Sequence, residues 1–192
     1  AGQFVLVAFF HGPQYRGCGE YHPFTICATD PGVAFRIGIK ALGDCTQQMQ
    51  RLEPGVAARV QGPFGEFLAE RPATPQIWVA GGIGITPFLA ILRSEALSQP
   101  TRLLYLFHSA ADAAFLNELQ ALADRDAHLI LEAVPTGAGI PNVEKLLPAS
   151  DLLSGNECYL CGPPALVKNI SRVLRDRGVS EQNIHFERLD FR

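Results

Sequence analysis

The second half of the chain alternates short apolar runs with helical stretches, and this alternation limits the possible folds more than any other feature. Five runs from residue 76 onward have the character of strands: QIWVA, RLLYLFH, HLILEAV, ECYLC and NIHFE. Helices are predicted at 87–98, 112–123 and 164–177, with a weaker one near 142–147. Continuously apolar strands separated by helices indicate a parallel sheet covered on both faces. Ligands of such sheets bind beyond the carboxyl ends of the strands.

The first half has the pattern of antiparallel β structure. Its strand candidates are GQFVLVAFF, YHPFTICA, AFRIGIKAL and GVAARVQGPFGEF, separated by Gly- and Pro-rich turns. Four strands are few for a closed barrel. We therefore predict two domains, with a boundary in ERPATPQ at 70–76. Residues 1–72 form an antiparallel β-barrel truncated at its N-terminus, and residues 73–192 form an α/β domain with a parallel five-stranded sheet.

Composition excludes several classes of function. The 192 residues are 47% hydrophobic and 18% charged, with a net charge of −3, so nothing favours nucleic-acid binding. No apolar run is long enough to span a membrane, and no signal peptide is visible. Five cysteines at irregular spacing indicate a reducing compartment, so we expect a cytoplasmic location.

The CYLC segment invites a metal or redox interpretation. Cys158 and Cys161 lie three residues apart on a predicted strand, so their thiols are expected on opposite faces. A structural zinc site needs about four ligands, and no second Cys or His pair occurs at ligand spacing. We interpret the pair as ordinary strand cysteines and predict no metal site.

A glycine-rich loop follows the first strand of the second half, in WVAGGIGITPF. Gly81, Gly82 and Gly84 lie at the strand end. Thr86 occupies the expected helix N-cap and Pro87 the first helical position, where both residue types are favoured. Such a loop exposes N–H groups to an anion, although a tight connection alone would also account for it.

Two further strand ends favour the ligand interpretation. Cys161, Gly162 and Pro163 end one strand before a helix, and His108 and Ser109 end another. Three polar or glycine-rich loops therefore converge on one edge of the sheet, which indicates a dinucleotide site.

The ordered motifs resemble a known family over nearly the whole chain. GGIGITPF and CGPPALV are similar to the nicotinamide-dinucleotide half of the ferredoxin–NADP⁺ reductase superfamily, and GQF, HPFT and GPFGEF to its flavin barrel. HPFT, the turn at 43–46 and the ending FERLDFR resemble one branch, the dehydrogenase portion of bacterial ferric-reductase-like proteins and NADPH oxidases. The resemblance implies an FAD-dependent oxidoreductase that takes hydride from NADPH or NADH and passes electrons to haem or ferric iron.

The resemblance also assigns flavin-site residues. His22, Pro23, Phe24 and Thr25 are expected along the flavin, with the Thr25 hydroxyl facing the ring nitrogen that accepts hydride. Lys40, with Gly43 and Thr46 of the following turn, is expected at the FAD pyrophosphate. Arg36 could assist Lys40 or be a solvated strand residue.

In the nucleotide half, Gly81, Gly82, Gly84 and Thr86 are expected at the pyrophosphate of the nicotinamide cofactor. Cys161, with Gly162 and Pro163 after it, is expected near the nicotinamide, although a buried Cys is often only a small hydrophobe.

The choice between NADPH and NADH is open. NADPH-specific members of the resembled family usually place an Arg after the second strand of this half, where it binds the 2′-phosphate. Here Ser109 follows that strand with no Arg directly beside it, and His108 or Arg125 could take the place of the Arg.

At the carboxyl end, Glu187 matches an acidic position near the reaction centre, and Phe191 either lies against the flavin or simply packs.

Three hypotheses follow for the whole protein. The first is a dehydrogenase module whose acceptor is a haem-bearing membrane domain of the same full-length chain, or ferric iron; it would then lie at the cytosolic face of a membrane. The second is a soluble reductase for a ferredoxin-type or oxygenase partner, which would be a separate chain because no iron–sulfur Cys cluster is present. The third is a flavin-free nucleotide-binding regulatory module.

Overall fold

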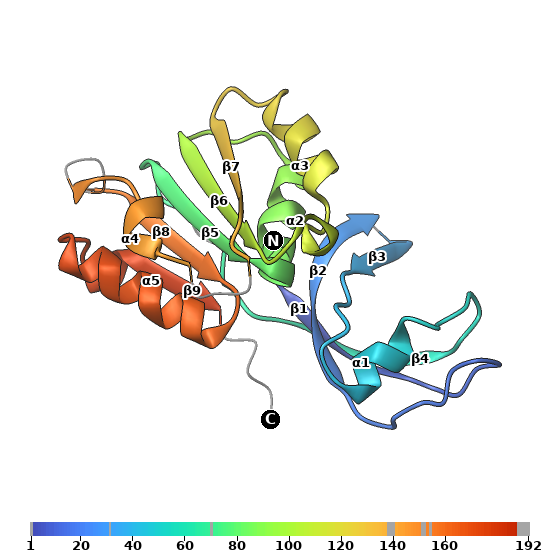
Figure 1. Cartoon of the computed structure of the whole chain (residues 1–192). Helices are drawn as coiled ribbons and strands as arrows, with labels where there is room; N and C mark the ends of the chain where they lie inside the picture. The colour runs from blue at the N-terminus through green and yellow to red at the C-terminus, as the bar shows by residue number, and fades with distance from the viewer. Residues whose placement is uncertain are drawn as a thin grey trace.

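Two sheets of opposite character build the protein (Figure 1). The computed structural model describes residues 2–30, 32–69, 71–137, 141–150, 153 and 155–187. Within these residues, a four-stranded antiparallel sheet has the order β3-β2-β1-β4, and a five-stranded parallel sheet has the order β7-β6-β5-β8-β9. The predicted combination of an antiparallel half and a parallel α/β half is confirmed.

The antiparallel sheet is open in the described residues. Its strands are β1 (Phe4–Phe9), β2 (His22–Asp30), β3 (Ala34–Ile37) and β4 (Ala58–Phe64). Alternating Val5 and Val7 of β1 pack with Phe24 and Met49 into a small core of their own. The third strand ends at Ile37 instead of continuing to residue 42, because the chain leaves the sheet there to form α1 (Asp44–Met49). That helix was not predicted.

All five predicted strands of the parallel sheet are present. They are β5 (Gln76–Gly81), β6 (Thr101–Phe107), β7 (Leu129–Pro135), β8 (Glu157–Cys161) and β9 (Ile184–Glu187). The chain runs outward from β5 through β6 to β7 and then returns to β8 on the other side of β5. The strand order therefore reverses next to β5, which is the position where open α/β sheets bind their ligands.

Helices cover both faces of the parallel sheet (Figure 1). The helices α2 (Thr86–Ser94) and α3 (Leu116–Ala123) lie on one face, and α4 (Val143–Leu146) and α5 (Pro164–Asp176) lie on the other. In the part of the chain that the structure describes, the short 3₁₀ turns η1 (Gly82–Ile85), η2 (Ala110–Asp112) and η4 (Glu181–Asn183) supplement them.

Two helix boundaries differ from the prediction. The helix expected to run to residue 98 ends at Ser94, because Glu95 turns to an extended conformation with φ −155°. The helix expected from residue 112 begins at Leu116, because Phe115 adopts a left-handed conformation with φ 61° that a continuous helix does not allow.

Alternate residues of the parallel strands feed two separate cores. Trp78 stacks on Phe88 of α2 with ring centroids 5.1 Å apart, while its neighbour Val79 packs on the α4–α5 side. Cys161 belongs to the first core and Cys158 to the second, so their thiols lie on opposite faces of the sheet, as predicted.

The two sheets are joined through α2, which packs against β2. Arg93 at the end of α2 donates from Nη1 to the Cys27 carbonyl of β2, 2.8 Å away. The same guanidinium makes two hydrogen bonds of 2.7 Å to the Glu118 carboxylate of α3. None of the described helices has the length and hydropathy of a membrane-spanning segment.

Candidate functional site

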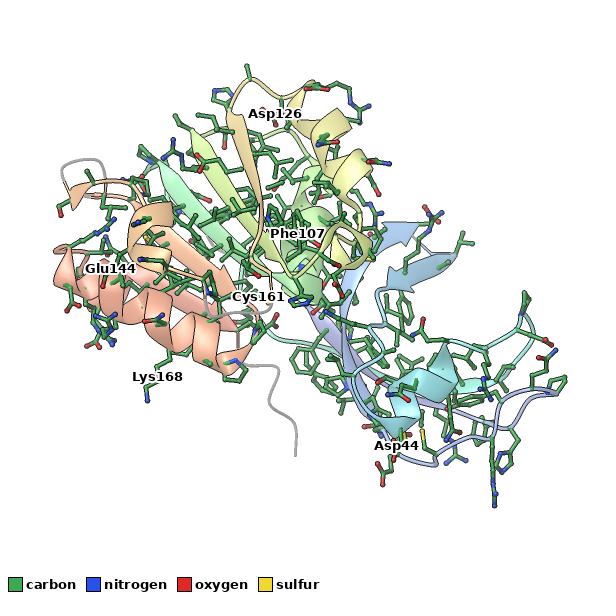
Figure 2. The ribbon with its side chains drawn as sticks, viewed as in Figure 1. Asp44, Phe107, Asp126, Glu144, Cys161 and Lys168 are labelled. Atoms are coloured by element: carbon green, nitrogen blue, oxygen red, sulfur yellow. The ribbon has the colours of Figure 1, made fainter. Side chains whose placement is uncertain are left out.

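A cavity of about 560 Å³ lies at the carboxyl ends of the parallel strands. It is lined by residues from the ends of β5, β6 and β8, from the start of α5 and from Lys40 of the first half: Lys40, Gly81, Gly82, Leu106, Phe107, His108, Thr136, Pro141, Pro163, Ala165, Leu166 and Asn169. Figure 2 shows Phe107 and Cys161 at this edge of the sheet, whereas Asp126 lies at the opposite edge. The predicted convergence of three strand ends is therefore present in the structure.

Glycines let these strand ends approach each other. A Cβ on Gly84 would lie 2.4 Å from the Cys161 carbonyl oxygen, and one on Gly162 would lie 3.0 Å from the Gly81 backbone. Gly82 differs, because its φ is +55° and a Cβ there would meet only Lys40 Nζ, at 3.6 Å. Gly81, Gly84 and Gly162 are thus required for packing, whereas Gly82 leaves its backbone open to the cavity.

The structure places Thr86 differently from the prediction. It is the first residue of α2, with Ile85 as N-cap and Pro87 one position further on. Its hydroxyl donates to the Ile83 carbonyl, 2.9 Å away, instead of accepting a helix N–H. The prediction of Thr86 as N-cap is wrong because η1 runs directly into α2, so no extended residue precedes the helix.

Ser109 and Arg125 lie away from the cavity wall. Ser109 donates to the Asp112 carboxylate, 2.7 Å away, while its neighbour His108 lines the cavity. That hydrogen bond, followed by the nearby Lys40 charge, lowers the pKa of Asp112. Arg125 follows α3 and bonds the Ala121 carbonyl, near the start of β7. Because α3 runs back along the sheet, Arg125 lies at the edge where the parallel strands begin, opposite the strand-end cavity. It therefore cannot take the place of an Arg that binds a 2′-phosphate in that cavity.

A second cavity, of about 490 Å³, lies between the antiparallel sheet and the glycine loop. All four residues of the HPFT motif line it, from His22 to Thr25, together with Gly38, Lys40, Leu42, Gly43, Asp44, Cys45, Thr46, Ile83 and Thr86. Thr25 is buried, and none of the described residues offers its hydroxyl oxygen a hydrogen-bond partner. A buried hydroxyl left in this state costs about 1–3 kcal/mol, which a ligand with a matching polar atom would recover.

The turn before α1 is held by its own hydroxyl. Thr46 Oγ1 accepts the N–H groups of Leu42 and Gly43, at 2.9 and 3.0 Å, and donates to the Gly43 carbonyl at 3.1 Å. Gly43 and Thr46 line this cavity, but the Thr46 hydroxyl is engaged in shaping the turn; their place at the FAD pyrophosphate stays a prediction.

Lys40 connects the two cavities, since it lines both. Its side chain is half-buried, and Nζ lies 3.7 Å from the Asp112 carboxylate. One cation at the boundary of two cavities can serve an anion in either of them.

Cys161 and Glu187 are the last residues of the neighbouring strands β8 and β9, and neither is among the residues that line the strand-end cavity. The thiol lies 4.0 Å from the Glu187 carboxylate, and burial, followed by that carboxylate, raises its pKa. Burial also raises the pKa of Glu187 to about 7. Burial of Cys161 therefore favours the neutral thiol over the thiolate. Phe191 lies outside the described residues.

Several lining residues were not predicted. Thr136 follows β7 and Asn169 lies one turn into α5, so both supply neutral polar groups to the strand-end cavity. Thr136 could have been found by extending the strand-end rule to the third strand. The second cavity, beside β2, is called the flavin-side cavity below. Ile83 lines it and carries no sequence signal beyond its place in the glycine loop.

The residues present fit a flavin and a nicotinamide dinucleotide. The cavity beside β2 combines apolar walls at Pro23, Phe24 and Ile83 with the unpartnered Thr25 hydroxyl and the Lys40 charge. The strand-end cavity adds an open glycine backbone and further hydrogen-bonding side chains. Mostly apolar walls with a few placed polar groups are typical of cofactor sites.

No protein-family model matches the chain, but individual proteins do. A ferredoxin–NAD(P)⁺ reductase component of naphthalene 1,2-dioxygenase and salicylate 5-hydroxylase systems from Ralstonia sp is 33% identical over 197 residues, covering 96% of this chain and 58% of that protein. A flavohemoprotein from Rhizobium meliloti is 30% identical over 215 residues, covering 97% of this chain and 51% of that protein. The chain thus spans about half the length of these curated relatives.

Among solved structures, the flavohem-like FAD/NAD-binding domain of nitric oxide dioxygenase from Vibrio cholerae matches with a TM-score of 0.79 and 21% identity. The match covers 97% of this chain and 83% of that one. An antiparallel sheet, a parallel sheet and two adjoining cavities define the class as a two-domain reductase fold. The chain has the fold of the ferredoxin–NADP⁺ reductase superfamily, so the resemblance is confirmed at that level. The narrower branch of ferric-reductase-like proteins and NADPH oxidases stays a prediction.

Proposed function

We propose that the chain is the dehydrogenase module of an oxidoreductase, with residues 1–72 binding FAD and residues 73–192 binding NADPH or NADH. One observation carries the proposal: a cavity with an unpartnered buried hydroxyl at Thr25 adjoins a strand-end cavity across Lys40. Adjacent sites of this kind suit two cofactors that must meet. The similarity to the Ralstonia ferredoxin–NAD(P)⁺ reductase component and to the Rhizobium flavohemoprotein supports the proposal.

The residues of the chain act by binding and positioning. Thr25 offers a hydroxyl that can donate or accept, Lys40 offers charge at the boundary of the cavities, and Gly82 offers open backbone. Cys161 is 1% exposed, and its backbone packs against Gly84, so it fixes the end of β8 beside the glycine loop.

The chemistry that FAD supplies when bound is acceptance of hydride from the nicotinamide and release of electrons one at a time. The protein needs no general base for this, because placement of the two cofactors is the main requirement. Glu187 and Cys161 therefore hold the nicotinamide end of the site instead of moving a proton.

Two candidates exist for the electron acceptor. The first is haem or ferric iron, with the haem in a membrane domain of the full-length protein and this module at its cytosolic face. The second is a ferredoxin or oxygenase component in the cytoplasm, which the Ralstonia reductase component favours. Both require the same two cavities.

The test is anaerobic mixing of the purified chain with FAD and then with NADPH or NADH, followed by flavin absorbance. We expect bleaching with at least one nucleotide, and the faster one identifies the preferred cofactor. Thr25→Val should slow bleaching by roughly tenfold to a hundredfold, the value of one lost hydrogen bond, while Thr25→Ser should stay within about threefold.

Two results would overturn parts of the proposal. Absence of both flavin binding and bleaching would favour the flavin-free regulatory module. Equal bleaching rates in Thr25→Val and the parent chain would remove Thr25 from the flavin site. Adding ferric citrate, a haem protein or a ferredoxin to the reduced protein then separates the acceptors by the rate of flavin reoxidation.

A further inference from the structure

A cluster of metal-binding side chains lies at the rim of the flavin-side cavity, and the proposed electron transfer does not require a metal there. Cys18, His22 and Cys45 bring their donor atoms within 4.8 Å of one another. They come from three separate segments: the loop between β1 and β2, the first residue of β2, and the first turn of α1. Spacings of 4 and 23 residues match no common zinc motif, so the sequence alone did not group them.

The distances suit a tetrahedral metal. Cys18 Sγ lies 3.7 Å from His22 Nε2. Zn–S bonds of about 2.3 Å and Zn–N bonds of about 2.0–2.1 Å, at a tetrahedral angle, place S and N about 3.6 Å apart. The two ligand atoms are therefore already at the separation that a shared metal requires.

The surroundings support a site that is held in place. Tyr15 is buried and its hydroxyl lies 3.5 Å from Cys18 Sγ, which fixes the loop on which Cys18 stands. Its ring packs edge-on against Phe9 of β1, with centroids 6.4 Å apart. Glu20 and Asp44 add negative charge near Cys45, which favours a cation over an anion. All three donors are half-buried, so an ion can reach them from solvent.

We propose that Cys18, His22 and Cys45 bind one Zn²⁺ ion, with a water molecule in the fourth position. Two thiolates and one imidazole are the soft donor set that Zn²⁺ takes, and they disfavour Mg²⁺ and Ca²⁺, which prefer oxygen. The ion would tie the β1–β2 loop to α1 at the rim of the flavin-side cavity, which His22 and Cys45 also line. This proposal revises the prediction that the chain has no metal site.

A disulfide is the competing use of the same two thiols. A disulfide would not involve His22, whereas the imidazole Nε2 already lies 3.7 Å from Cys18 Sγ. The third donor is therefore the observation that favours a metal.

The experiment uses the full chain, reduced, treated with chelator and free of flavin and nucleotide. Titration with Co²⁺ is expected to give one equivalent of a four-coordinate spectrum with a thiolate-to-cobalt charge-transfer band, and Zn²⁺ should displace it. Cys18→Ala should weaken Zn²⁺ binding by more than about 100-fold, since even residues that only orient a ligand cost 10–100-fold. Cys18→Ser, which keeps the side-chain size, provides a second variant in case the first does not fold.

The matched control is Cys27→Ala, which removes a buried cysteine of the same strand outside the cluster. It should bind Zn²⁺ like the parent chain. Three results would overturn the proposal: no thiolate-to-cobalt band, equal binding by Cys18→Ala and the parent, or a Cys18–Cys45 disulfide whose reduced form takes up no metal. Because flavin and nucleotide are absent, none of these outcomes depends on the proposed dehydrogenase activity.

Discussion

The carbonyl oxygen of Cys161 lies 2.4 Å from the point where a Cβ on Gly84 would stand. The glycine loop after β5 and the end of β8 are therefore in backbone contact. The contact brings two strand ends together at the position where the strand order reverses, so position 84 has no room for a side chain.

Gly84→Ala should therefore destabilise the fold. The added methyl group meets backbone, which cannot rotate away, so we expect a loss of about 1–3 kcal/mol in the free energy of unfolding. Urea denaturation measures it. Gly43→Ala is the matched control, because a Cβ there meets nothing within 4 Å and its φ of −135° suits any residue. Equal stability of the two variants would contradict the close approach.

Lys40→Met should weaken the binding of both FAD and the nicotinamide nucleotide, because Lys40 lines both cavities. The loss of one charge-assisted hydrogen bond, about 1.5–3 kcal/mol, corresponds to roughly tenfold to a hundredfold in each dissociation constant. Calorimetric titration with FAD and with the nucleotide measures the two separately. Lys145→Met, on exposed α4, should change neither. Loss confined to FAD would leave Lys40 with only its predicted flavin role.

Sequence patterns predicted the sheets well because strand hydrophobicity is a local property. The five parallel strands were found this way, the glycine loop and the Cys-Gly-Pro segment from their places at strand ends, and the HPFT motif from its resemblance to a known family. Boundaries were missed where a single backbone conformation decides them, as at Phe115 with φ 61°. The helix α1 was missed because it is only six residues long and mostly polar, so it carries no apolar period.

Contacts between distant segments could not be predicted from the sequence. Lys40 was assigned to the flavin side alone, and its place at the strand-end cavity depends on how α2 packs on β2. The grouping of Cys18 with Cys45 likewise depends on where α1 turns back toward the β1–β2 loop. Spacing patterns recognise sites within one element or between adjacent ones. The two sites described here each combine residues from three or more separate segments.

Arg93 should hold the two sheets together. It bonds the Cys27 carbonyl of β2 and the Glu118 carboxylate of α3, and that carboxylate raises the pKa of the Arg93 guanidinium. Arg93→Met leaves a buried carbonyl and a carboxylate without this partner, so we expect a loss of about 2–3 kcal/mol in the free energy of unfolding. Arg102→Met removes an exposed pair with Glu132 at 2.9 Å and should cost under about 1 kcal/mol. Similar losses of stability in both variants would show that the Arg93 contacts stabilise the fold no more than an exposed ion pair does.

Glu187 should make stability depend on pH. Burial raises the pKa of its carboxyl from 4.5 to about 7 in the folded chain. Between these two values the folded state keeps a proton that the unfolded state has released, so stability falls as pH rises through this window and levels off above about 7. The ionised group is then a net cost to the fold.

Glu187→Gln removes this cost, since the amide stays neutral. We expect the variant to match the parent near pH 4 and to exceed its free energy of unfolding by about 1–2 kcal/mol at pH 8, a value reduced for partial solvent access. Urea denaturation across pH 4–8 gives the difference curve, whose midpoint should fall between the two pKa values. Glu53→Gln, on an exposed loop after α1, should give a flat difference. A flat curve for Glu187→Gln too would mean that the Glu187 carboxylate is well solvated and that burial does not raise its pKa.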